Sequence, residues 1–257
     1  MDFTVLTLFP EFLDAFFENG IIGRAMDREL IRGRTVNIRE YSTDKHNTVD
    51  DRPYGGGCGM VMKPGPLEAA IDAAKGITPD AGVILMSPQG ERFSQVKACE
   101  LAARKAGLIF VCGRYEGIDE RVYARLVDEE ISMGDFVMTG GELAAMAVID
   151  ATARMIPGVL GGEDSSLTDS FMDTRLEHAQ YTRPETYKGM DVPGVLLSGN
   201  HERIRQWRKR SSLERTFMKR PDLFDVQAPD EAEKEILRQW RSELDALVNG
   251  PTGGADG

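Results

Sequence analysis

The stretch "LIFVCGRYEGIDERV", from Leu108 to Val122, decides how the rest of the chain is interpreted. Its first five residues, Leu108 to Cys112, form a short and unbroken apolar run, which predicts a strand covered on both faces. The chain then turns at Gly113, and three polar residues precede Gly117. Because open α/β sheets bind ligands beyond the carboxyl ends of their strands, this turn is a candidate ligand site. An ordinary strand-to-helix turn is the alternative interpretation of this one loop.

The 257 residues can form one large domain or two modest ones, and 41% hydrophobic with 28% charged residues is typical of a globular protein. No apolar run approaches the ~20 residues that a membrane span needs. The opening "MDFTVLTLFPEF" has neither the basic start nor the cleavage site of a signal peptide. A cytoplasmic protein without a membrane partner is therefore expected. Cys58, Cys99 and Cys112 are odd in number and include no C-x-x-C pair, which argues against a disulfide framework or a zinc site.

The first part of the chain alternates strand and helix patterns, as an α/β domain does. Strands are expected at Phe3–Leu8, Gly82–Ser87, Leu108–Cys112 and Asp135–Thr139. Helices are expected at Glu11–Asn19 closed by Gly20, Pro66–Lys75 closed by Gly76, Ser94–Ala106, and Glu142–Ile156 ended by Pro157. Further helices are expected at Glu202–Arg210, at Leu213–Lys219 and from Asp230 onward, where Glu233 completes a capping-box spacing.

Periodicity is lost between residues 160 and 177, where Gly, Ser, Thr and Asp accumulate. The sequence therefore predicts an α/β domain at residues 1–159, a flexible linker at 160–177, a helical domain at 178–249 and a disordered tail at 250–257.

The formal net charge of -11 argues at face value against a nucleic-acid partner. Its distribution is uneven, since the stretch from His201 to Arg220 carries +6 and the stretch from Asp222 to Asn249 carries -5. The basic stretch is either a solvated helix surface or a site for phosphates. Trp207 and Phe217 within it are expected to anchor the core.

Three glycine-containing loops follow predicted strands or precede a helix: residues 87–90, 113–117 and 134–141. Together they indicate a ligand cleft at one sheet edge. Exposed backbone groups suit a ligand with adenine, ribose and small polar groups, but they do not specify it. Neither G-x-G-x-x-G nor the P-loop pattern is present, and the three histidines, His46, His178 and His201, are scattered.

Several longer motifs carry a resemblance to a known family. They are "DKHNTVDDRPYGGGCGM" (44–60), "MSPQG" (86–90), "VCGRYEGIDER" (111–121), "SMGDFVMTGGELAAMAVIDATARMIPGVLG" (132–161) and "YTRPE" (181–185). In this order they resemble the bacterial tRNA (guanine-N1-)-methyltransferases of the SPOUT superfamily. The resemblance implies an α/β fold with a SPOUT-type parallel sheet and a deep trefoil knot, followed by a smaller, mostly α-helical C-terminal domain. Such a knot is an exception to the usual unknotted connections.

The resemblance also implies S-adenosyl-L-methionine as cofactor, bound in a bent conformation by the three loops. Carried over by position, the cofactor-binding residues are Ser87, Pro88, Gly90, Gly113, Tyr115, Glu116, Gly117, Met133, Gly134, Phe136, Met138, Gly140 and Gly141. For Met133, Phe136 and Met138, packing in the core is the alternative role.

The implied reaction methylates N1 of the guanosine immediately 3′ of the anticodon, gives 1-methylguanosine and supports reading-frame maintenance. N1 must lose a proton, and an aspartate with an ordinary pKa of ~3.9 is a weak base for it. A guanidinium aimed at O6 would stabilise the anion that develops. By resemblance Asp169 is the base and Arg154 the guanidinium, while Glu116 positions the guanine or the cofactor. Judged without the family, Asp169 is a polar linker residue and Arg154 a helix-end cation.

The resemblance further implies a homodimer whose active site lies at the subunit interface. Because Asp169 lies in the linker, it can reach a cofactor only if the linker folds over the cleft, and we expect the linker to become ordered when the tRNA base arrives. The candidates for tRNA contact are Lys45, His46, Arg52, Arg203, Arg208, Lys209, Arg215 and Arg220. Mg²⁺ is an open second cofactor, either for tRNA folding or for the proton transfer, and no metal-ligand cluster in the sequence decides between these roles.

Two local departures from the family pattern are Cys58, in a glycine loop, and Ala179–Gln180, before "YTRPE". Three other functions stay open at this point. The chain could be an RNA-binding protein on the same scaffold without catalysis, a methyltransferase for another RNA site or a ribose hydroxyl, or, more distantly, a nucleotide hydrolase. Retention of Asp169, Arg154 and all three loops argues against the first.

Overall fold

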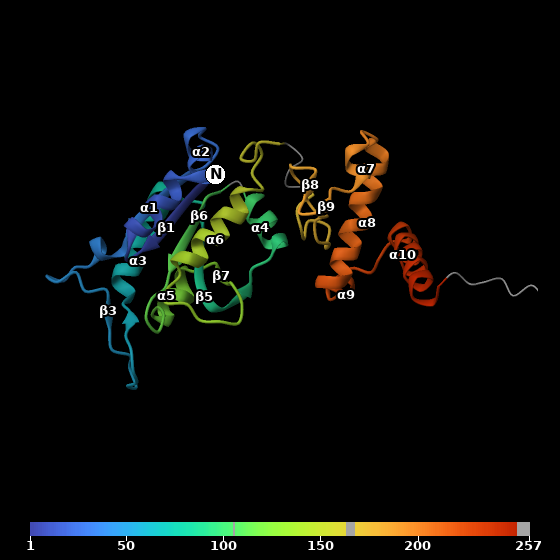
Figure 1. Ribbon diagram of the computed structural model, residues 1–257. Helices are drawn as coiled ribbons and strands as arrows, with labels where there is room; N and C mark the ends of the chain where they lie inside the picture. Colours follow the sequence, from blue (N-terminus) through green and yellow to red (C-terminus); the bar gives the residue numbers. More distant parts are fainter. Residues whose placement is uncertain (105, 163–167, 251–257) are drawn as a thin grey trace, which may run out of the picture. The chain divides into compact units, whose positions relative to one another are not determined.

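Residues 1–104, 106–162 and 168–250 are described by a computed structural model. The chain divides into two units, Met1–Ser166 and Leu167–Gly257, each of which has its own internal packing (Figure 1). No helix in the described ranges combines the length and the apolar character needed to cross a membrane.

The first unit is built on a five-stranded sheet in the order β2-β1-β6-β5-β7. The strands are β1 (Asp2–Thr7), β2 (Arg32–Asn37), β5 (Gly82–Arg92), β6 (Leu108–Cys112) and β7 (Glu129–Ser132), and every neighbouring pair is parallel. All five residues of β6 are buried, which confirms the prediction from its unbroken apolar run.

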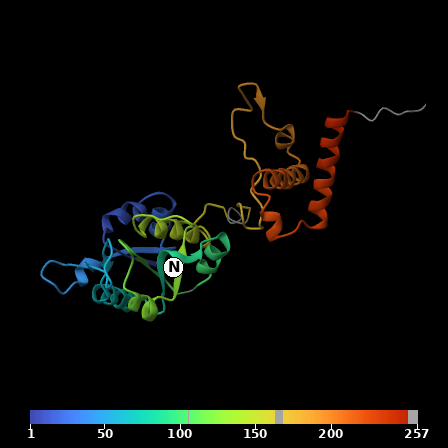
Figure 2. The same cartoon turned by 90° about the horizontal axis from the view of Figure 1, so that it is seen from below.

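The side chains of β6 alternate between two hydrophobic cores. Leu108, Phe110 and Cys112 join one core, and Ile109 and Val111 join the other. The first core is completed by α1 (Pro10–Glu18), α2 (Gly20–Asp27), α4 (Gln95–Ala102) and α6 (Glu142–Ala153). The second core is completed by α3 (Pro64–Ile77) and α5 (Glu120–Leu126). Helices thus cover both faces of the sheet (Figures 1 and 2).

Local sequence explains where several of these helices begin. Pro64 and Pro66 stand in the first turn of α3, where a missing N–H costs nothing. Ser94 caps α4, because its hydroxyl accepts the backbone N–H of Lys97 at 3.3 Å. Asp119 caps α5 in the same way through the N–H of Arg121.

The structure corrects several expected elements. Asp135–Thr139 is not a strand; the edge strand is β7, Glu129–Ser132, which lies earlier in the chain. Two of the three apolar residues that suggest a strand are exposed, Phe136 at 56% and Val137 at 84%. The strand β2 and the helices α2 and α5 carry weak patterns and were not expected.

Helix boundaries differ as well. The helix that begins after Ser94 ends at Ala102 rather than Ala106, and α3 continues through Gly76 to Ile77. Gly20 begins α2 instead of merely closing α1. The two helices expected around Ser211 form one helix, α8 (His201–Lys219), because the buried Ser211 lies on its packed side.

The remaining elements of the first unit are short. A turn of 3-10 helix, η1 (Ile38–Tyr41), follows β2, and the two-residue strands β3 (Asp50–Asp51) and β4 (Val61–Met62) pair antiparallel. They flank the glycine-rich loop at residues 55–59.

The second unit contains α8, two short helices, α7 (Gly194–Leu197) and α9 (Leu223–Val226), and the long α10 (Glu231–Asn249). A small hairpin, β8 (Thr186–Tyr187) with β9 (Met190–Asp191), precedes them. Asp230 and Glu233 form the expected capping box. Trp207 is half-buried beside Tyr181, but Phe217 is an exposed residue that makes an edge contact with Trp240, with ring centroids 5.6 Å apart.

The expected linker lies partly outside the described residues, because 163–167 are not among them, and neither are 251–257 of the expected tail. The described residues of the expected linker from Thr168 to Glu177 belong to the second unit. Arg175 is buried there, where it donates to the Glu233 carboxylate at 3.0 Å and to the carbonyl of Gln227 at 3.1 Å.

The fold predicts a clear contrast between two phenylalanines. Phe110→Ala should lower the free energy of unfolding by about 3–5 kcal/mol, because it leaves a cavity at the centre of the sheet. Phe136→Ala should change it by no more than about 0.5 kcal/mol, because its ring is largely exposed. Urea denaturation of both variants checks this, and equal effects would contradict the assignment of β6 as the central buried strand.

Candidate functional site

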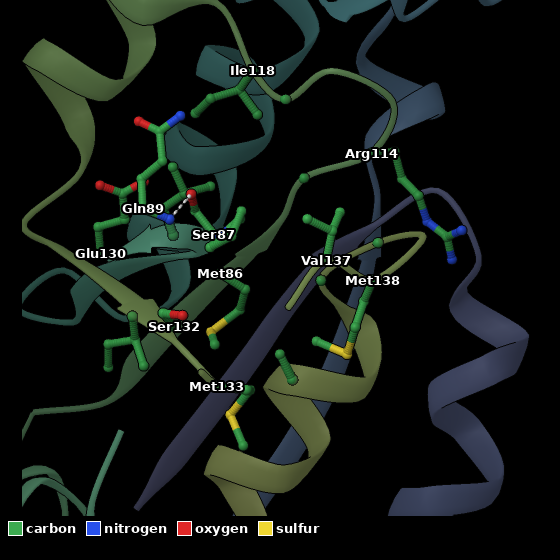
Figure 3. A pocket seen from close by; sticks show the side chains of 18 of the residues that line it. Met86, Ser87, Gln89, Arg114, Ile118, Glu130, Ser132, Met133, Val137 and Met138 are labelled. Atoms are coloured by element: carbon green, nitrogen blue, oxygen red, sulfur yellow. Dashed lines mark hydrogen bonds between the residues drawn. The ribbon is translucent and has the colours of Figure 1, made fainter. Parts of the chain in front are cut away.

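A pocket of about 460 Å³ lies at the carboxyl ends of β6 and β7 and beside the middle of β5, where the pairing of β5 with β7 shifts register after Met86 (Figure 3). Its walls are the segment after Met86, the loop after β6, the loop after β7 and the first turn of α6. The volume falls in the range of about 300–1,000 Å³ that small-molecule sites occupy. The position is the one that the sequence predicts for a ligand in an open parallel sheet.

Most of the predicted cofactor-binding residues line this pocket. They are Ser87, Pro88, Gly113, Tyr115, Glu116, Gly117, Met133, Phe136, Met138, Gly140 and Gly141. Figure 3 shows Met86, Met133 and Met138 toward α6, with Ser87, Gln89 and Glu130 together on another side. Met133 and Met138 also pack against the first hydrophobic core, so these two side chains separate the pocket from that core.

Two predicted residues do not line the pocket. Gly90 lies where β5 passes β7, and a Cβ there would come within 2.4 Å of the Glu130 carbonyl group. Gly90 therefore allows β5 and β7 to approach each other closely. Gly134 lies in a turn in which its N–H donates to the Ser132 hydroxyl at 3.1 Å.

Sequence reasoning missed about half of the lining. The missed residues are Leu85, Met86, Gln89, Arg114, Ile118, Glu120, Tyr123, Glu130, Ile131, Ser132, Val137, Thr139 and Ala144. Most of them adjoin predicted residues, so the loops themselves were the available signal. Glu130 and Ile131 had no such signal, because the sequence pattern does not predict their strand, β7.

The pocket carries more negative than positive charge. Glu116, Glu120 and Glu130 contribute carboxylates to its lining. Arg114 is the basic residue among the lining residues that the structure describes, but its guanidinium is engaged by the Glu142 carboxylate, with Nη2 2.9 Å from Oε2. Figure 3 shows the Arg114 side chain extending away from Met138. A ligand that carries positive charge fits this environment.

The loop after β6 is held in a strained conformation. Tyr115 has a φ of 60°, which bulky residues rarely adopt, and the N–H of Gly117 closes the turn on the carbonyl of Arg114 at 3.0 Å. The N–H of Glu116 donates to the carbonyl of Met60 at 3.0 Å, which ties this loop to the glycine-rich segment before β4. Strain kept in place by such contacts is a feature of ligand sites.

Of the three predicted catalytic residues, Glu116 and Arg154 belong to the first unit, where they lie apart, and Asp169 belongs to the second unit. Glu116 lines the pocket. Arg154 is the C-cap of α6, whereas the pocket touches the N-terminal end of that helix at Gly141 and Ala144. At ~1.5 Å per residue, the two ends of α6 are ~20 Å apart. Asp169 belongs to the second unit, where it is half-buried and its carbonyl accepts the N–H of Met172 at 3.3 Å.

The predicted tRNA contacts of the first unit lie in one exposed loop region that holds Lys45, His46 and Arg52. Asp44 orders this loop, because its carboxylate accepts the N–H of Thr48 at 3.0 Å and that of His46 at 2.7 Å. The hydrogen bonds from Thr48, more than the other contacts, lower the pKa of Asp44 to about 2. The loop cap therefore stays charged in the neutral and mildly acidic range.

The predicted tRNA contacts of the second unit differ in their surroundings. Arg203 and Arg208 are exposed on α8. Lys209 lies 3.9 Å from Asp230, and Arg220 donates to both oxygens of Asp222 at 2.8 and 2.7 Å. These last two cations are thus partly neutralised by acidic neighbours. Arg215, the fifth candidate, is half-buried and lines a separate pocket of the second unit.

No group of three or more His, Cys, Asp or Glu residues in the described parts of the chain is arranged to hold a metal ion. The three cysteines are free thiols there, with Cys58 exposed and Cys112 buried at the end of β6.

Fold and pocket together define an α/β protein whose parallel sheet has a pocket of small-molecule size at its carboxyl edge. Comparison with known proteins makes the class specific. Residues 1–226 match the family described as tRNA (Guanine-1)-methyltransferase TrmD. The chain belongs to this family.

Several curated relatives are named tRNA (guanine-N(1)-)-methyltransferase. The chain is 53% identical to the one from Myxococcus xanthus over 240 residues, which cover 93% of this chain and 97% of that protein. It is 50% identical to the one from Bacillus licheniformis over 246 residues, covering 94% and 100%, and 52% identical to the one from Dehalococcoides mccartyi over 245 residues, covering 95% and 98%.

The cysteines allow a direct check of the sheet edge. Burial, reinforced by the nearby Glu142 carboxylate, raises the pKa of the Cys112 thiol well above its usual value. Iodoacetamide at pH 8 should therefore alkylate the exposed Cys58 and leave Cys112 unmodified until the protein unfolds, as read by peptide mass spectrometry. Equal labelling of both thiols in the native protein would contradict the placement of Cys112.

Proposed function

We propose that this protein transfers the methyl group of S-adenosyl-L-methionine to N1 of the guanosine immediately 3′ of the anticodon in tRNA. The product would be 1-methylguanosine, whose role is to support reading-frame maintenance. The observation that carries the proposal is family membership across residues 1–226, combined with a pocket at the loops where the family pattern predicts the cofactor.

The pocket residues fit this cofactor chemically. Its sulfonium and ammonium groups are positive, and the lining contributes the carboxylates of Glu116, Glu120 and Glu130. The rings of Tyr115 and Phe136 are about half exposed and offer surfaces for an adenine. When bound, the cofactor supplies an electrophilic methyl group; the protein binds and orients it.

Methylation at N1 of guanine requires a base that removes the N1 proton and a cationic group that stabilises the negative charge left on the guanine. We assign the base to Asp169 and the stabilising guanidinium to Arg154. An aspartate with an ordinary pKa can remove so weakly acidic a proton only if the charge that spreads onto O6 is stabilised in the transition state. Glu116, in the pocket wall, would orient the guanine or the cofactor.

The length of α6 supports a homodimer with shared active sites. Gly141 and Ala144 at its start line the pocket, while Arg154 stands at its far end, ~20 Å away along the helix axis. An arginine side chain does not span that distance. If Arg154 acts at such a pocket, it must come from a second copy of the chain.

Several finer features belong to the same proposal. A deep trefoil knot of the SPOUT type is part of the proposal and rests on family membership. The helical C-terminal domain at residues 178–249 would bind tRNA, with Arg203 and Arg208 as its exposed cations. A tRNA substrate implies a cytoplasmic enzyme. Mg²⁺ is a candidate second cofactor, carried by the RNA or engaged in the proton transfer.

The substrate and the base can be tested together. Methyl transfer from labelled S-adenosyl-L-methionine should occur with tRNA transcripts that have guanosine 3′ of the anticodon and not with those that have adenosine. Asp169→Ala should retain cofactor binding but lose at least about 100-fold in turnover, because it removes a general base. Asp173→Ala is the matched control in the second unit. Label in both transcripts would point to another RNA site, and near-normal turnover of Asp169→Ala would remove the assignment of the base.

Shared active sites predict complementation between two inactive variants. Ser87→Trp should fill the pocket and abolish cofactor binding, whereas Arg154→Ala removes the guanidinium that the second copy supplies. The two variants are mixed, partly unfolded and refolded together. The mixture should recover about a quarter of wild-type activity, because half of the dimers would be mixed and each mixed dimer would carry one intact site. No recovery, with mixed dimers shown by differential tagging, would contradict a site built from two copies.

A further inference from the structure

Glu142 is a buried carboxylate that the proposed chemistry does not use. It is the first residue of α6 and only 1% exposed. Its Oε1 accepts the hydroxyl of Thr7 at 2.8 Å and the Nε–H of Arg114 at 3.2 Å, and its Oε2 lies 2.9 Å from Nη2 of Arg114. A charge in such a place is tolerated only when it is paired and hydrogen-bonded, so these contacts must persist in the folded protein.

Arg114 extends this network to a second loop. Its Nη1 donates to the carbonyl of Thr139 at 3.2 Å, and its guanidinium stacks on the ring of Phe9 at 4.5 Å. Gly140 lies against the same side chain, since a Cβ at that position would come within 2.2 Å of Nε. The guanidinium is therefore fixed on several sides.

The two loops joined in this way are two walls of the pocket. Residues 113–118 form one wall and residues 136–141 the other. A backbone bridge pairs Arg114 with Gly140, beside the hydrogen bond between Gly141 and Gly113. The network is anchored in the sheet by Thr7, the last residue of β1, whose hydroxyl also accepts the N–H of Phe9 at 3.0 Å.

We propose that Glu142 is a positioning residue for the cofactor, which acts through Arg114 to hold both loops in the arrangement that binds it. The identity of the ligand rests on the proposed function; the network does not. A pocket whose loops are already ordered avoids the entropy cost of ordering them on binding. Loss of the ion pair should therefore weaken cofactor binding, while the groups that contact RNA stay unchanged.

Three variants separate the parts of the network. Glu142→Gln keeps an oxygen for Thr7 but removes the charge, Arg114→Met removes the guanidinium, and Thr7→Val removes the hydroxyl while keeping the shape. The dissociation constant of S-adenosylhomocysteine, measured by calorimetry, and the KM for S-adenosyl-L-methionine should both rise about ten-fold in the first two variants, with a smaller rise in the third. The KM for tRNA should stay within about two-fold of wild type.

A double variant and a distant control complete the design. Glu142→Gln combined with Arg114→Met should be no worse than Arg114→Met alone, because both changes remove one interaction. Glu233→Gln breaks a buried ion pair of the second unit, with Arg175 at 3.0 Å, and should leave the dissociation constant of S-adenosylhomocysteine unchanged.

The outcomes distinguish this inference from the proposed function. If the wild-type protein does not bind S-adenosylhomocysteine, the proposed cofactor is wrong. If it binds and Glu142→Gln binds equally well, the proposed function stands and the positioning role is overturned. A lower melting temperature with fewer binding-competent molecules but an unchanged dissociation constant would likewise overturn it, since that is the signature of a purely structural ion pair. Should Glu142→Gln fail to fold, Thr7→Val carries the test.

Discussion

Burial of β6 on both faces is the constraint on which the rest of the first unit depends. Its five residues divide between two cores, so the strand needs a parallel neighbour on each edge and helices on each side. β1 and β5 supply the edges, and the helices that follow the strands supply the covers. Once β6 is central, its carboxyl end can only open onto a crevice between loops, and the pocket forms there.

The loops around this crevice combine strain with rigid support. Tyr115 has a left-handed conformation, and its loop is held by the hydrogen bonds of Gly117 to Arg114 and of Glu116 to Met60. The loop before α6 is fixed by the buried pair of Glu142 and Arg114. Arg114, which lines the pocket, is thereby paired with Glu142 outside it. The acidic side chains therefore determine the electrostatic potential inside the pocket. A pocket that is apolar on its α6 side and acidic elsewhere suits a cation with an aromatic moiety better than it suits a phosphate.

The basic character of α8 is less uniform than its sequence indicates. The stretch from His201 to Arg220 carries a net +6, yet Lys209 and Arg220 lie beside Asp230 and Asp222. Neighbouring acids from the next turn and from the start of α10 screen part of the helix. Arg203 and Arg208 keep their exposure, so attraction for a phosphate backbone is concentrated toward the first half of α8.

The sequence by itself determined the central strand, the glycine loops at residues 113–117 and 134–141, the capping box of α10 and, through long motifs, the family. These features depend on neighbouring residues along the chain, which is the information that apolar periodicity and motifs contain. Residues 87–90, expected as a third loop, lie within β5. Only the tertiary structure decided that Asp135–Thr139 is an exposed loop, that β7 is the edge strand, that Gly90 serves strand packing and that Glu142 joins Thr7 to Arg114. The physical reason is that burial and ion pairing join residues far apart in the chain, as Thr7 and Glu142 are, and no local pattern specifies which of them meet.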